Sequence, residues 1–343
     1  MTMTAIDTAG TAGTGDIVVQ ATDLTVEVST ERGRVTIVDG VDLAVRRNEV
    51  VGVVGESGSG KTVTSLAVMG LLPKNGRISR GSVELMGRRI SDLDERELAD
   101  VRGVQVAMIF QEPRRCLNPA FTVGDQVAES LRRHRGWSRK RAMERTVELF
   151  ELVEIPQARH RVKQYPHEFS GGMCQRVMLA MALACDPMML IADEPTTALD
   201  VTVQRQVLEL IRRLQAELGL GLMLITHDLG VVAEMCDRVS VMYAGQVVEE
   251  ADVDTLFHNP AHPYTSALLQ SMLEPTRRGE PLGYISGVVP APHQFPAGCR
   301  FQDRCGHAAA DRCRRPIALQ PATSGHLSRC ARVDELVLPG VGA

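Results

Sequence analysis

The chain has 343 residues, with 38 lysines and arginines against 42 aspartates and glutamates, which gives a formal net charge of −4. The length allows about two domains, and a composition that is 44% hydrophobic and 23% charged excludes a disordered or fibrous chain. The charge balance gives no support to a nucleic-acid or acidic-lipid binder, because such proteins carry a basic excess.

No long apolar segment is present. The longest uninterrupted apolar run covers residues 177–185, well short of the roughly 18 residues that a membrane span needs. Residues 1–16 contain neither lysine nor arginine, so they are predicted to form a flexible N-terminal tail and not a signal peptide. We therefore expect a cytosolic protein.

Short apolar runs alternate with helical patterns over residues 17–250. Runs rich in β-branched residues predict strands that are buried on both faces of a sheet, and they occupy residues 50–54, 104–110, 188–192, 222–226 and 239–243. Between them, apolar residues recur at helical spacing, as in Met143, Val147 and Phe150. The pattern predicts an α/β domain whose helices cover a largely parallel sheet.

The same patterns predict two further parts of the chain, an inserted helical subdomain and a C-terminal domain. Between the runs at 104–110 and 188–192 the chain shows helical patterning without a good strand, which favours an inserted helical subdomain at about 113–187 over a loop. Ten of the 17 prolines lie at or beyond Pro260, where regular patterns also become rarer. We therefore predict a smaller C-terminal domain over residues 251–343.

A glycine-rich motif follows the first apolar run. Gly55-Glu-Ser-Gly-Ser-Gly-Lys-Thr62 completes the pattern G-x-x-x-x-G-K-[ST], in which glycines let backbone N–H groups wrap a β-phosphate at the start of a helix. Lys61 would reach the β- and γ-phosphates, and Thr62 would bind Mg²⁺. A simple strand-to-helix turn is the alternative, which the flanking patterns disfavour. The predicted nucleotide-binding residues are Gly55, Ser57, Gly58, Ser59, Gly60, Lys61, Thr62 and Val63.

A second motif is acidic. The apolar run at 188–192 leads into Asp193 and Glu194. Beside a phosphate-binding loop, Asp193 would hold Mg²⁺ and Glu194 would act as general base toward the attacking water. A solvated acidic turn is the alternative for this motif alone, but together the two motifs specify an NTPase.

With four more motifs in a fixed order, residues 17–250 resemble the ATP-binding cassette (ABC) ATPases. Phe169-Ser170-Gly171-Gly172 is similar to the family's signature motif, which implies a loop that contacts a nucleotide held by a partner subunit. Gln111 resembles the Q-loop glutamine that contacts metal and water, Ala198-Leu199-Asp200 the D-loop, and His227 the switch histidine that contacts the γ-phosphate. The resemblance implies a P-loop NTPase (RecA-like) core. Taken alone, each motif also fits an ordinary helix cap or strand end.

The C-terminal region narrows the resemblance. Asn259-Pro-Ala-His-Pro-Tyr-Thr265, followed by a helical stretch at 266–273, resembles the extension found on ATP-binding subunits of oligopeptide, dipeptide and nickel importers. A proline-rich linker is the alternative for this string alone. The resemblance implies an ATPase that powers import of short peptides or of a related small solute such as nickel. A soluble ABC ATPase not coupled to transport and an iron–sulfur redox-regulated ATPase are the alternatives.

Four of the eight cysteines form a C-terminal group with the spacing C-x5-C-x7-C-x16-C, namely Cys299, Cys305, Cys313 and Cys330. Four thiolates suit a [4Fe–4S] cluster or tetrahedral Zn²⁺. No paired C-x-x-C knuckle typical of structural zinc is present, and the resemblance to importer subunits, some of which carry a cluster, favours [4Fe–4S]. Zn²⁺, with His293, His307 or His326 as further ligands, and free buried thiols are the alternatives.

The resemblance also implies partners. We expect a second ABC ATPase subunit, a distinct paralogue that forms a heterodimer, together with two transmembrane permease subunits and, indirectly, an extracytoplasmic solute-binding protein. The expected place is the cytoplasmic face of the plasma (inner) membrane, as a peripheral protein that binds no nucleic acid. One departure from the family stands out: Val28 occupies the position where many members stack an aromatic ring on adenine.

Overall fold

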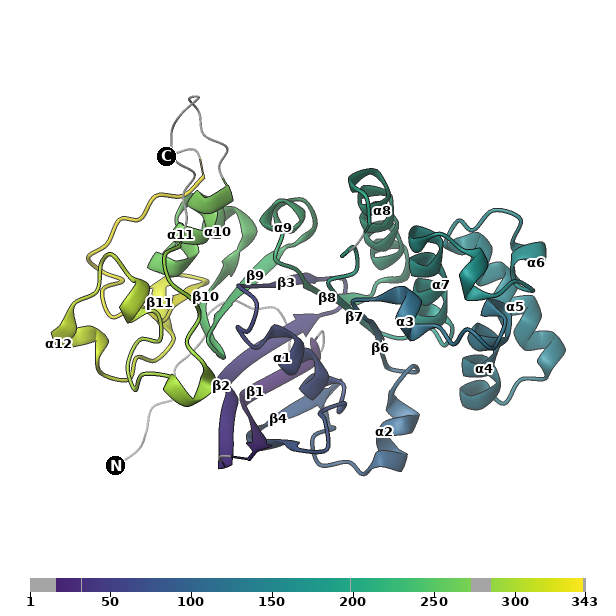
Figure 1. The fold of residues 1–343 in the computed structure, drawn as a ribbon, viewed down its shortest axis with the longest axis horizontal. Coiled ribbons are helices and arrows are strands. Elements are labelled where there is room, and N and C mark those ends of the chain that lie inside the picture. The colour runs from purple at the N-terminus through teal and green to yellow at the C-terminus, as the bar shows by residue number, and fades with distance from the viewer. Residues whose placement is uncertain (1–16, 32, 198, 273–284, 342–343) are drawn as a thin grey trace.

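The computed structural model describes residues 17–31, 33–197, 199–272 and 285–341. The predicted N-terminal tail and Ala198 of the predicted D-loop lie outside these residues. The described chain forms two sheets, and most of its helices lie along one side of the molecule and at one end (Figure 1). Among the described residues, no helix combines the length and apolar character that a membrane crossing requires.

The larger sheet contains the five predicted strands. Its members are β3 (Val50–Val54), β6 (Val106–Ile109), β7 (Met189–Asp193), β8 (Gly221–Ile225), β9 (Arg238–Tyr243), β10 (Gln246–Asp252), β11 (Gln320–Thr323) and β12 (His326–Ser328). They follow the order β11-β12-β10-β9-β3-β8-β7-β6, and β6, β7, β8, β3 and β9 run parallel. Every residue of β3, β7 and β8 is buried, which is why these strands read as unbroken apolar runs.

The smaller sheet is antiparallel, in the order β2-β1-β4-β5. Its strands are β1 (Ile17–Thr30), β2 (Gly33–Arg46), β4 (Gly76–Leu85) and β5 (Arg88–Arg89). The sequence patterns do not predict this sheet, because register shifts between Ala21 and Leu24 interrupt the pairing of β1 with β2. A bulge of this kind breaks the two-residue alternation that identifies a strand.

Helices and short helical turns complete the described fold. They are α1 (Lys61–Val68), α2 (Glu95–Val101), α3 (Pro113–Cys116), α4 (Val123–Arg135), α5 (Arg139–Leu152), α6 (Ala158–Arg161), α7 (Gly171–Leu183), α8 (Val201–Leu218), α9 (Leu229–Met235), α10 (Val253–His258), α11 (Pro263–Met272), α12 (Ala310–Cys313), η2 (Pro166–Glu168), η3 (Pro292–Gln294) and η4 (Gln302–Arg304). The helices α3 to α7 lie together at one end (Figure 1). They fall in the segment between β6 and β7 for which a helical subdomain is predicted; its boundaries stay a prediction.

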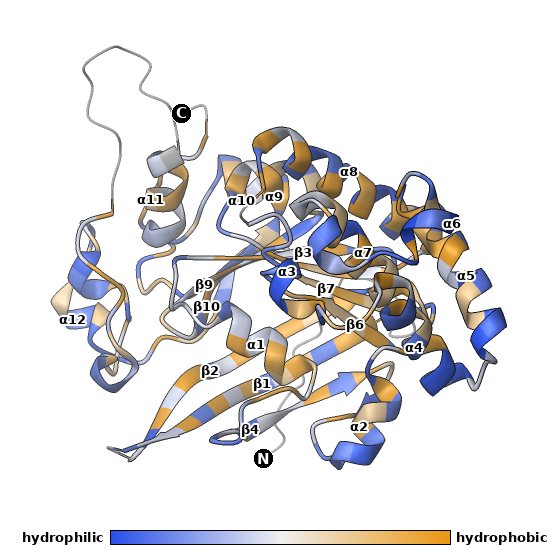
Figure 2. Cartoon of the chain, turned by 45° about the vertical axis from the view of Figure 1, so that its right-hand side comes forward, coloured by the Kyte–Doolittle hydropathy of each residue, from blue (hydrophilic) through white to orange (hydrophobic). Residues whose placement is uncertain are grey.

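In the helices, the spacing of apolar residues in the sequence matches the face that is buried. In α8, Val207, Ile211 and Leu214 are buried while the intervening Arg212 and Arg213 are exposed, so the apolar stripe faces the sheet. Figure 2 shows this alternation as orange and blue stripes along α8, above strands that are largely orange. The packing of an amphipathic face supplies most of the stability of such a helix.

The C-terminal region is joined to the larger sheet. β12 pairs with β10, where Glu249 faces Ser328, so β11 and β12 extend the sheet beyond β10. The carboxylate of Glu249 is fully buried and accepts hydrogen bonds from the Ala261 amide (2.6 Å), the His262 amide (2.8 Å) and His326 Nε2 (2.8 Å). These bonds fix the path of the chain between β10 and α11. The predicted domain boundary at residue 251 stays a prediction.

The structure gives the His-Pro-Tyr string a local role. The Tyr264 amide donates to His262 Nδ1 at 3.1 Å, and both side chains are buried. Burial lowers the pKa of His262 to about 3, so the ring is neutral and can accept this bond. The Tyr264 ring packs against Tyr243 and Phe301, with ring centroids 4.6 and 5.3 Å away. The string therefore anchors α11 to the end of β9.

Replacing the buried Glu249 is expected to weaken the attachment of the C-terminal region. Glu249→Ala leaves two backbone amides and His326 without their acceptor, so we expect the free energy of unfolding to fall by about 3 kcal/mol. Urea denaturation followed by circular dichroism measures it. Glu148→Ala, on the surface of α5, is the control and should change stability by less than about 0.5 kcal/mol. Equal stability of the two variants would contradict the prediction.

Candidate active site

The glycine-rich loop follows β3 and leads into α1. Gly55, Gly58 and Gly60 have φ angles of 149°, 82° and 103°, a region that residues with a Cβ rarely adopt. A Cβ on Gly55 would also lie 2.1 Å from the Met242 carbonyl oxygen. The loop can therefore curl against the end of β9 only with glycine at this position.

The lysine of the loop is directed into it. Lys61 is only 8% exposed, and its Nζ donates to the carbonyl oxygens of Gly55 at 2.7 Å and Glu56 at 3.0 Å. Burial lowers the pKa of Lys61, an effect that the nearby carboxylates of Glu194 and Asp193 oppose. The ammonium group is thus held at the centre of the loop, where an anion would offer it better acceptors.

Asp193 ends β7 beside this loop. Its carboxylate is 4% exposed, and Thr62 Oγ1 lies 3.4 Å from its Oδ1. Burial raises the pKa of Asp193, and the hydrogen bond from Thr62 partly offsets this effect. A buried carboxylate next to a hydroxyl is an all-oxygen donor set, which is the set that Mg²⁺ prefers. The two residues therefore fit the Mg²⁺ role predicted for them.

Three side chains of the site contact the carboxylate of Glu194. Its backbone has a φ of 45°, an uncommon conformation for a non-glycine residue, and its amide donates to the Ile225 carbonyl oxygen at 2.9 Å. Gln111 Nε2 and Thr197 Oγ1 each donate to Glu194 Oε2 at 2.8 Å, and His227 Nδ1 lies 3.1 Å from Oε1. The strained backbone directs the carboxylate toward these three side chains.

These contacts also set the charge of Glu194. Burial raises its pKa, but the hydrogen bonds from Thr197 and His227 and the nearby Lys61 outweigh burial, so the net pKa lies below the ordinary value. Glu194 is therefore ionised at neutral pH and able to accept a proton. The structure brings together Gln111, Glu194 and His227, which the sequence places in three separate motifs; their catalytic roles stay predictions.

The signature and D-loop residues lie at two helix starts. Ser170 precedes α7, where its Oγ accepts the Met173 amide at 3.3 Å, and Asp200 precedes α8, where its carboxylate accepts the Val203 amide at 3.0 Å. A Cβ on Gly172 would lie 2.3 Å from Val203 Cγ1. Gly172 is thus required for the close approach of α7 and α8, a packing reason that the sequence did not reveal.

Two contacts of the site escaped the sequence analysis. Thr197 holds Glu194, yet the sequence Pro195-Thr-Thr197 gives no signal that separates it from the preceding threonine. Glu56, the acidic residue of the loop, pairs with Arg304 of the C-terminal region. No motif or spacing links these two positions in the sequence.

The four C-terminal cysteines line one largely enclosed cavity: Cys299, Cys305, Cys313 and Cys330. All eight cysteines of the chain are free thiols. In the part of the chain that the structure describes, no group of three or more His, Cys, Asp or Glu residues is arranged so that it could hold a metal ion. The predicted [4Fe–4S] cluster is therefore not confirmed. His326, an alternative zinc ligand, binds Glu249 instead.

Backbone N–H groups contact three of these thiols, and burial affects the pKa values of Cys299 and Cys330. Three of the sulfur atoms accept a backbone N–H at 3.4 Å: Cys305 from His307, Cys313 from Ala309 and Cys330 from Arg332. Burial raises the pKa of Cys299 to about 12 and that of Cys330 to about 11. Cys299 and Cys330 are therefore protonated at neutral pH when nothing is bound. Hydrogen bonds to sulfur are among the contacts that tune iron–sulfur clusters.

Comparison with known proteins agrees with this geometry. Residues 38–197 match the family described as "ABC transporter", and residues 248–313 match "Oligopeptide/dipeptide transporter, C-terminal region". The chain is 49% identical to a putative peptide import ATP-binding protein of Brucella ovis, over 90% of this chain and 94% of that protein. It is 46% identical to the oligopeptide transport ATP-binding protein OppD of Salmonella typhimurium, over 94% and 96% of the two chains.

Solved structures extend the comparison. The dimeric ATP-binding cassette MJ0796, in a post-hydrolysis state bound to ADP and Pi, is 27% identical to this chain, with a TM-score of 0.62. The match covers 68% of this chain and 98% of the cassette. The structure of CbiO1 from Clostridium perfringens, described as part of an ABC transporter complex, matches with a TM-score of 0.60 and 24% identity, over 71% of this chain and 91% of the other.

Removal of the loop lysine tests the phosphate role of the glycine-rich motif. Lys61→Ala should weaken ATP binding by about 10- to 100-fold, because a charge-assisted hydrogen bond to phosphate is lost. Titration of the purified chain with a fluorescent ATP analogue measures this change. Lys74→Ala, at an exposed position, should bind like the unchanged chain. Equal affinity of Lys61→Ala and Lys74→Ala would contradict the assignment.

Proposed function

This chain belongs to the ABC transporter ATPase family, and on that premise we propose that it is the ATP-hydrolysing subunit of a membrane importer of short peptides. The observation that carries the proposal is the convergence of Gln111, Glu194 and His227 at the sheet edge next to the phosphate-binding loop. The match of residues 248–313 to the oligopeptide/dipeptide transporter C-terminal region supports peptides as the solute.

ATP would bind along the loop between β3 and α1. The loop amides wrap the phosphates, and Lys61 exchanges its bonds to the Gly55 and Glu56 carbonyl oxygens for phosphate oxygens. Thr62, Gln111 and Asp193 are the proposed ligands of Mg²⁺, which supplies charge compensation to the phosphates when bound. Val28, partly buried on β1, offers adenine an apolar contact in place of an aromatic ring.

Glu194 acts as general base in the proposed hydrolysis. Gln111 and Thr197 hold its Oε2, which fixes the carboxylate while it takes a proton from the attacking water. His227 Nδ1 faces Oε1, which leaves Nε2 as the ring nitrogen for the γ-phosphate. The depressed pKa of Glu194 keeps the base ionised at neutral pH.

We place the second nucleotide-binding partner on the surface that carries Ser170 and Asp200. Both residues are exposed at helix starts, so the amides of Gly171 and Gly172 can serve a nucleotide held by another subunit. Val201 beside them is 83% exposed, an apolar side chain suited to a protein contact. The proposed partner is a distinct ATPase paralogue, which gives a heterodimer.

A groove on the helical end is the proposed contact for the two permease subunits. It measures about 680 Å³, and its lining includes Asp125 of α4 and Met143 and Val147 of α5. Phe121, just before α4, is 56% exposed. Gln111 lies at the other end of the short segment that joins β6 to this region, so closure on ATP can be passed to the groove.

The proposed location is the cytoplasmic face of the inner membrane, and a solute-binding protein takes part indirectly.

The four-cysteine cavity is the proposed site of a [4Fe–4S] cluster. Four cysteine side chains line one enclosed space, and three of them accept backbone N–H groups, which supports the proposal. Among the described residues these side chains are not arranged to hold a metal ion, so the segments that carry them would have to rearrange around the cluster. Zn²⁺ is the alternative occupant. The proposed role is structural, because ligand bonds from four separate positions would fix this loop-rich region. An ATPase whose turnover responds to oxidation of the cluster, and one not coupled to transport, are less favoured.

Loss of the proposed base tests the mechanism. Glu194→Gln should lower ATP hydrolysis by the assembled transporter by about 100-fold or more, because the amide cannot accept the proton. ATP binding should remain close to that of the unchanged protein. Phosphate release and uptake of a labelled peptide into membrane vesicles measure the two coupled activities.

The matched control is Glu217→Gln, an exposed residue of α8. Its hydrolysis and peptide uptake should equal those of the unchanged transporter. Hydrolysis by Glu194→Gln at the same level as Glu217→Gln would overturn the base assignment. Normal hydrolysis without peptide uptake in the unchanged transporter would overturn the solute assignment alone.

Metal analysis tests the cysteine site. Protein purified without oxygen should hold about four iron and four sulfide per chain. Cys313→Ser, which removes a buried ligand, should lose most of this content, whereas Cys116→Ser, at an exposed position on α3, should keep it. Zinc in place of iron, or equal iron in both variants, would contradict the [4Fe–4S] proposal.

A further inference from the structure

A buried arginine of the C-terminal region binds the phosphate-binding loop. Arg304 NH1 lies 2.7 Å from Glu56 Oε2 and NH2 lies 3.0 Å from Oε1, a bidentate ion pair. The Arg304 side chain is only 6% exposed. Its remaining donors bind Ser286 O, Ile285 O and Tyr243 Oη. All five N–H groups of the guanidinium are therefore used, which fixes its orientation.

The backbone of the same loop residue is held as well. The Glu56 amide donates to Tyr264 Oη at 2.9 Å, and Tyr264 is fully buried. The rings of Tyr264, Tyr243 and Phe301 pack in mutual contact, with centroids 4.6 to 5.3 Å apart. Side chain and backbone of Glu56 are thus both bound by groups that rest on one rigid aromatic cluster.

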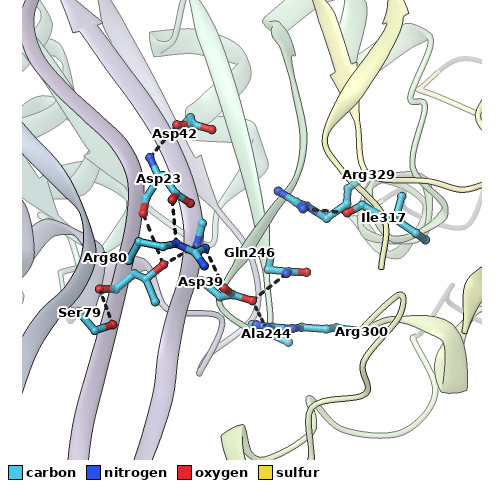
Figure 3. Close-up of polar contacts among 12 residues, drawn as sticks. Asp23, Asp39, Asp42, Ser79, Arg80, Ala244, Gln246, Arg300, Ile317 and Arg329 are labelled. Atoms are coloured by element: carbon cyan, nitrogen blue, oxygen red, sulfur yellow. Dashed lines mark hydrogen bonds and ion pairs between the residues drawn. The ribbon is translucent and has the colours of Figure 1, made fainter. Parts of the chain in front are cut away.

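A second contact reaches the loop through the turn between β9 and β10. Arg300 NH1 donates to the Ala244 carbonyl oxygen and NH2 to Asp39, each at 2.5 Å (Figure 3). The next residue of this turn, Gly245, donates its amide to the Ser59 carbonyl oxygen at 2.8 Å. Arg300 therefore supports the turn on which the far side of the loop rests.

Both arginines belong to one short segment, residues 299–305, which we call the clamp segment. Cys299 and Cys305 of the four-cysteine cavity form its two ends. We propose that the clamp segment, through Arg304 and Arg300, positions the phosphate-binding loop for ATP. Arg304, Arg300 and Tyr264 are thus positioning residues. The inference rests on the phosphate role of this loop in the proposed function.

Contacts that hold the loop before ATP arrives preorganise it for binding. The three glycines of the loop favour many backbone conformations, and ATP binding must select one of them. A loop that is already held at Glu56 and Ser59 loses less conformational entropy when ATP binds. Without the clamp, the same contacts to phosphate form at a lower apparent affinity, whereas the chemistry of bound ATP is unchanged. The expected signature is therefore a higher KM for ATP at a nearly constant kcat.

A double-mutant cycle tests the clamp in the assembled transporter. Arg304→Gln and Glu56→Gln should each raise the KM for ATP about five- to tenfold with kcat changed less than about twofold, since each breaks the same ion pair. The double variant should resemble either single variant. Arg304→Lys, which keeps the charge, should restore part of the affinity. Tyr264→Phe should raise KM by a smaller factor, because it removes one acceptor and keeps the ring.

Arg89→Gln is the matched control, because Arg89 lies on the exposed edge strand β5 and pairs there with Asp92. Its KM should be unchanged. An unchanged KM in Glu56→Gln and Tyr264→Phe would overturn the proposal. Both changes are conservative, so they remain informative if Arg304→Gln does not fold. A double variant whose KM rises by the product of the two single effects would also overturn the proposal. So would a fall in kcat that matches the rise in KM.

Amide hydrogen exchange of the purified full chain separates this inference from the proposed function. Without nucleotide, the amides of residues 56–60 should exchange faster in Glu56→Gln and Arg304→Gln than in Arg89→Gln, as expected of a loop freed from its clamp. Unchanged exchange would overturn the clamp even where ATP binds normally. Faster exchange in a chain that binds no ATP would overturn the nucleotide role and leave the clamp standing.

Discussion

Parallel pairing of β6, β7, β8 and β3 places the carboxyl ends of four strands at one edge of the larger sheet. Each strand ends in a residue of the site or leads directly into one: Gln111, Asp193, His227 and the glycine-rich loop. Ligands of open α/β sheets bind at this edge. Because the strands are buried on both faces, their ends cannot shift independently. The contacts of Glu194 therefore depend on strand register as much as on the side chains themselves.

Much of this arrangement can be predicted from short stretches of the sequence. Continuous apolar runs identify the parallel strands because burial on both faces leaves no polar alternation. The site residues are recognisable because each stands at the end of such a run, as Gln111 and Asp193 do. Chain order then suffices to predict that they meet, since parallel strands end at one edge. The structure brings Gln111, Glu194 and His227 together at that edge, and their catalytic roles stay predictions.

Other features could not be predicted because their causes are not local. The bulged β1 lacks the alternation that marks a strand, and the partner of Glu56 lies in a proline-rich region with little periodicity. Gly172 was assigned to phosphate binding, yet its lack of a side chain also admits Val203 of α8. For the cysteines, spacing indicates a shared site, and the structure places all of them around one cavity. What occupies that cavity depends on chemistry that neither spacing nor backbone geometry determines.

The pairing of Glu56 with Arg304 has a consequence for how the chain is made. The two residues are 248 positions apart, so the ribosome completes the loop, the parallel strands and Glu194 long before Arg304 is synthesised. A nascent or truncated chain thus carries the phosphate loop without its last support. Only a chain that includes the clamp segment holds the loop from both sides. Until Arg304 has been made and folded into place, the loop would therefore bind ATP more weakly, by the factor expected for Arg304→Gln.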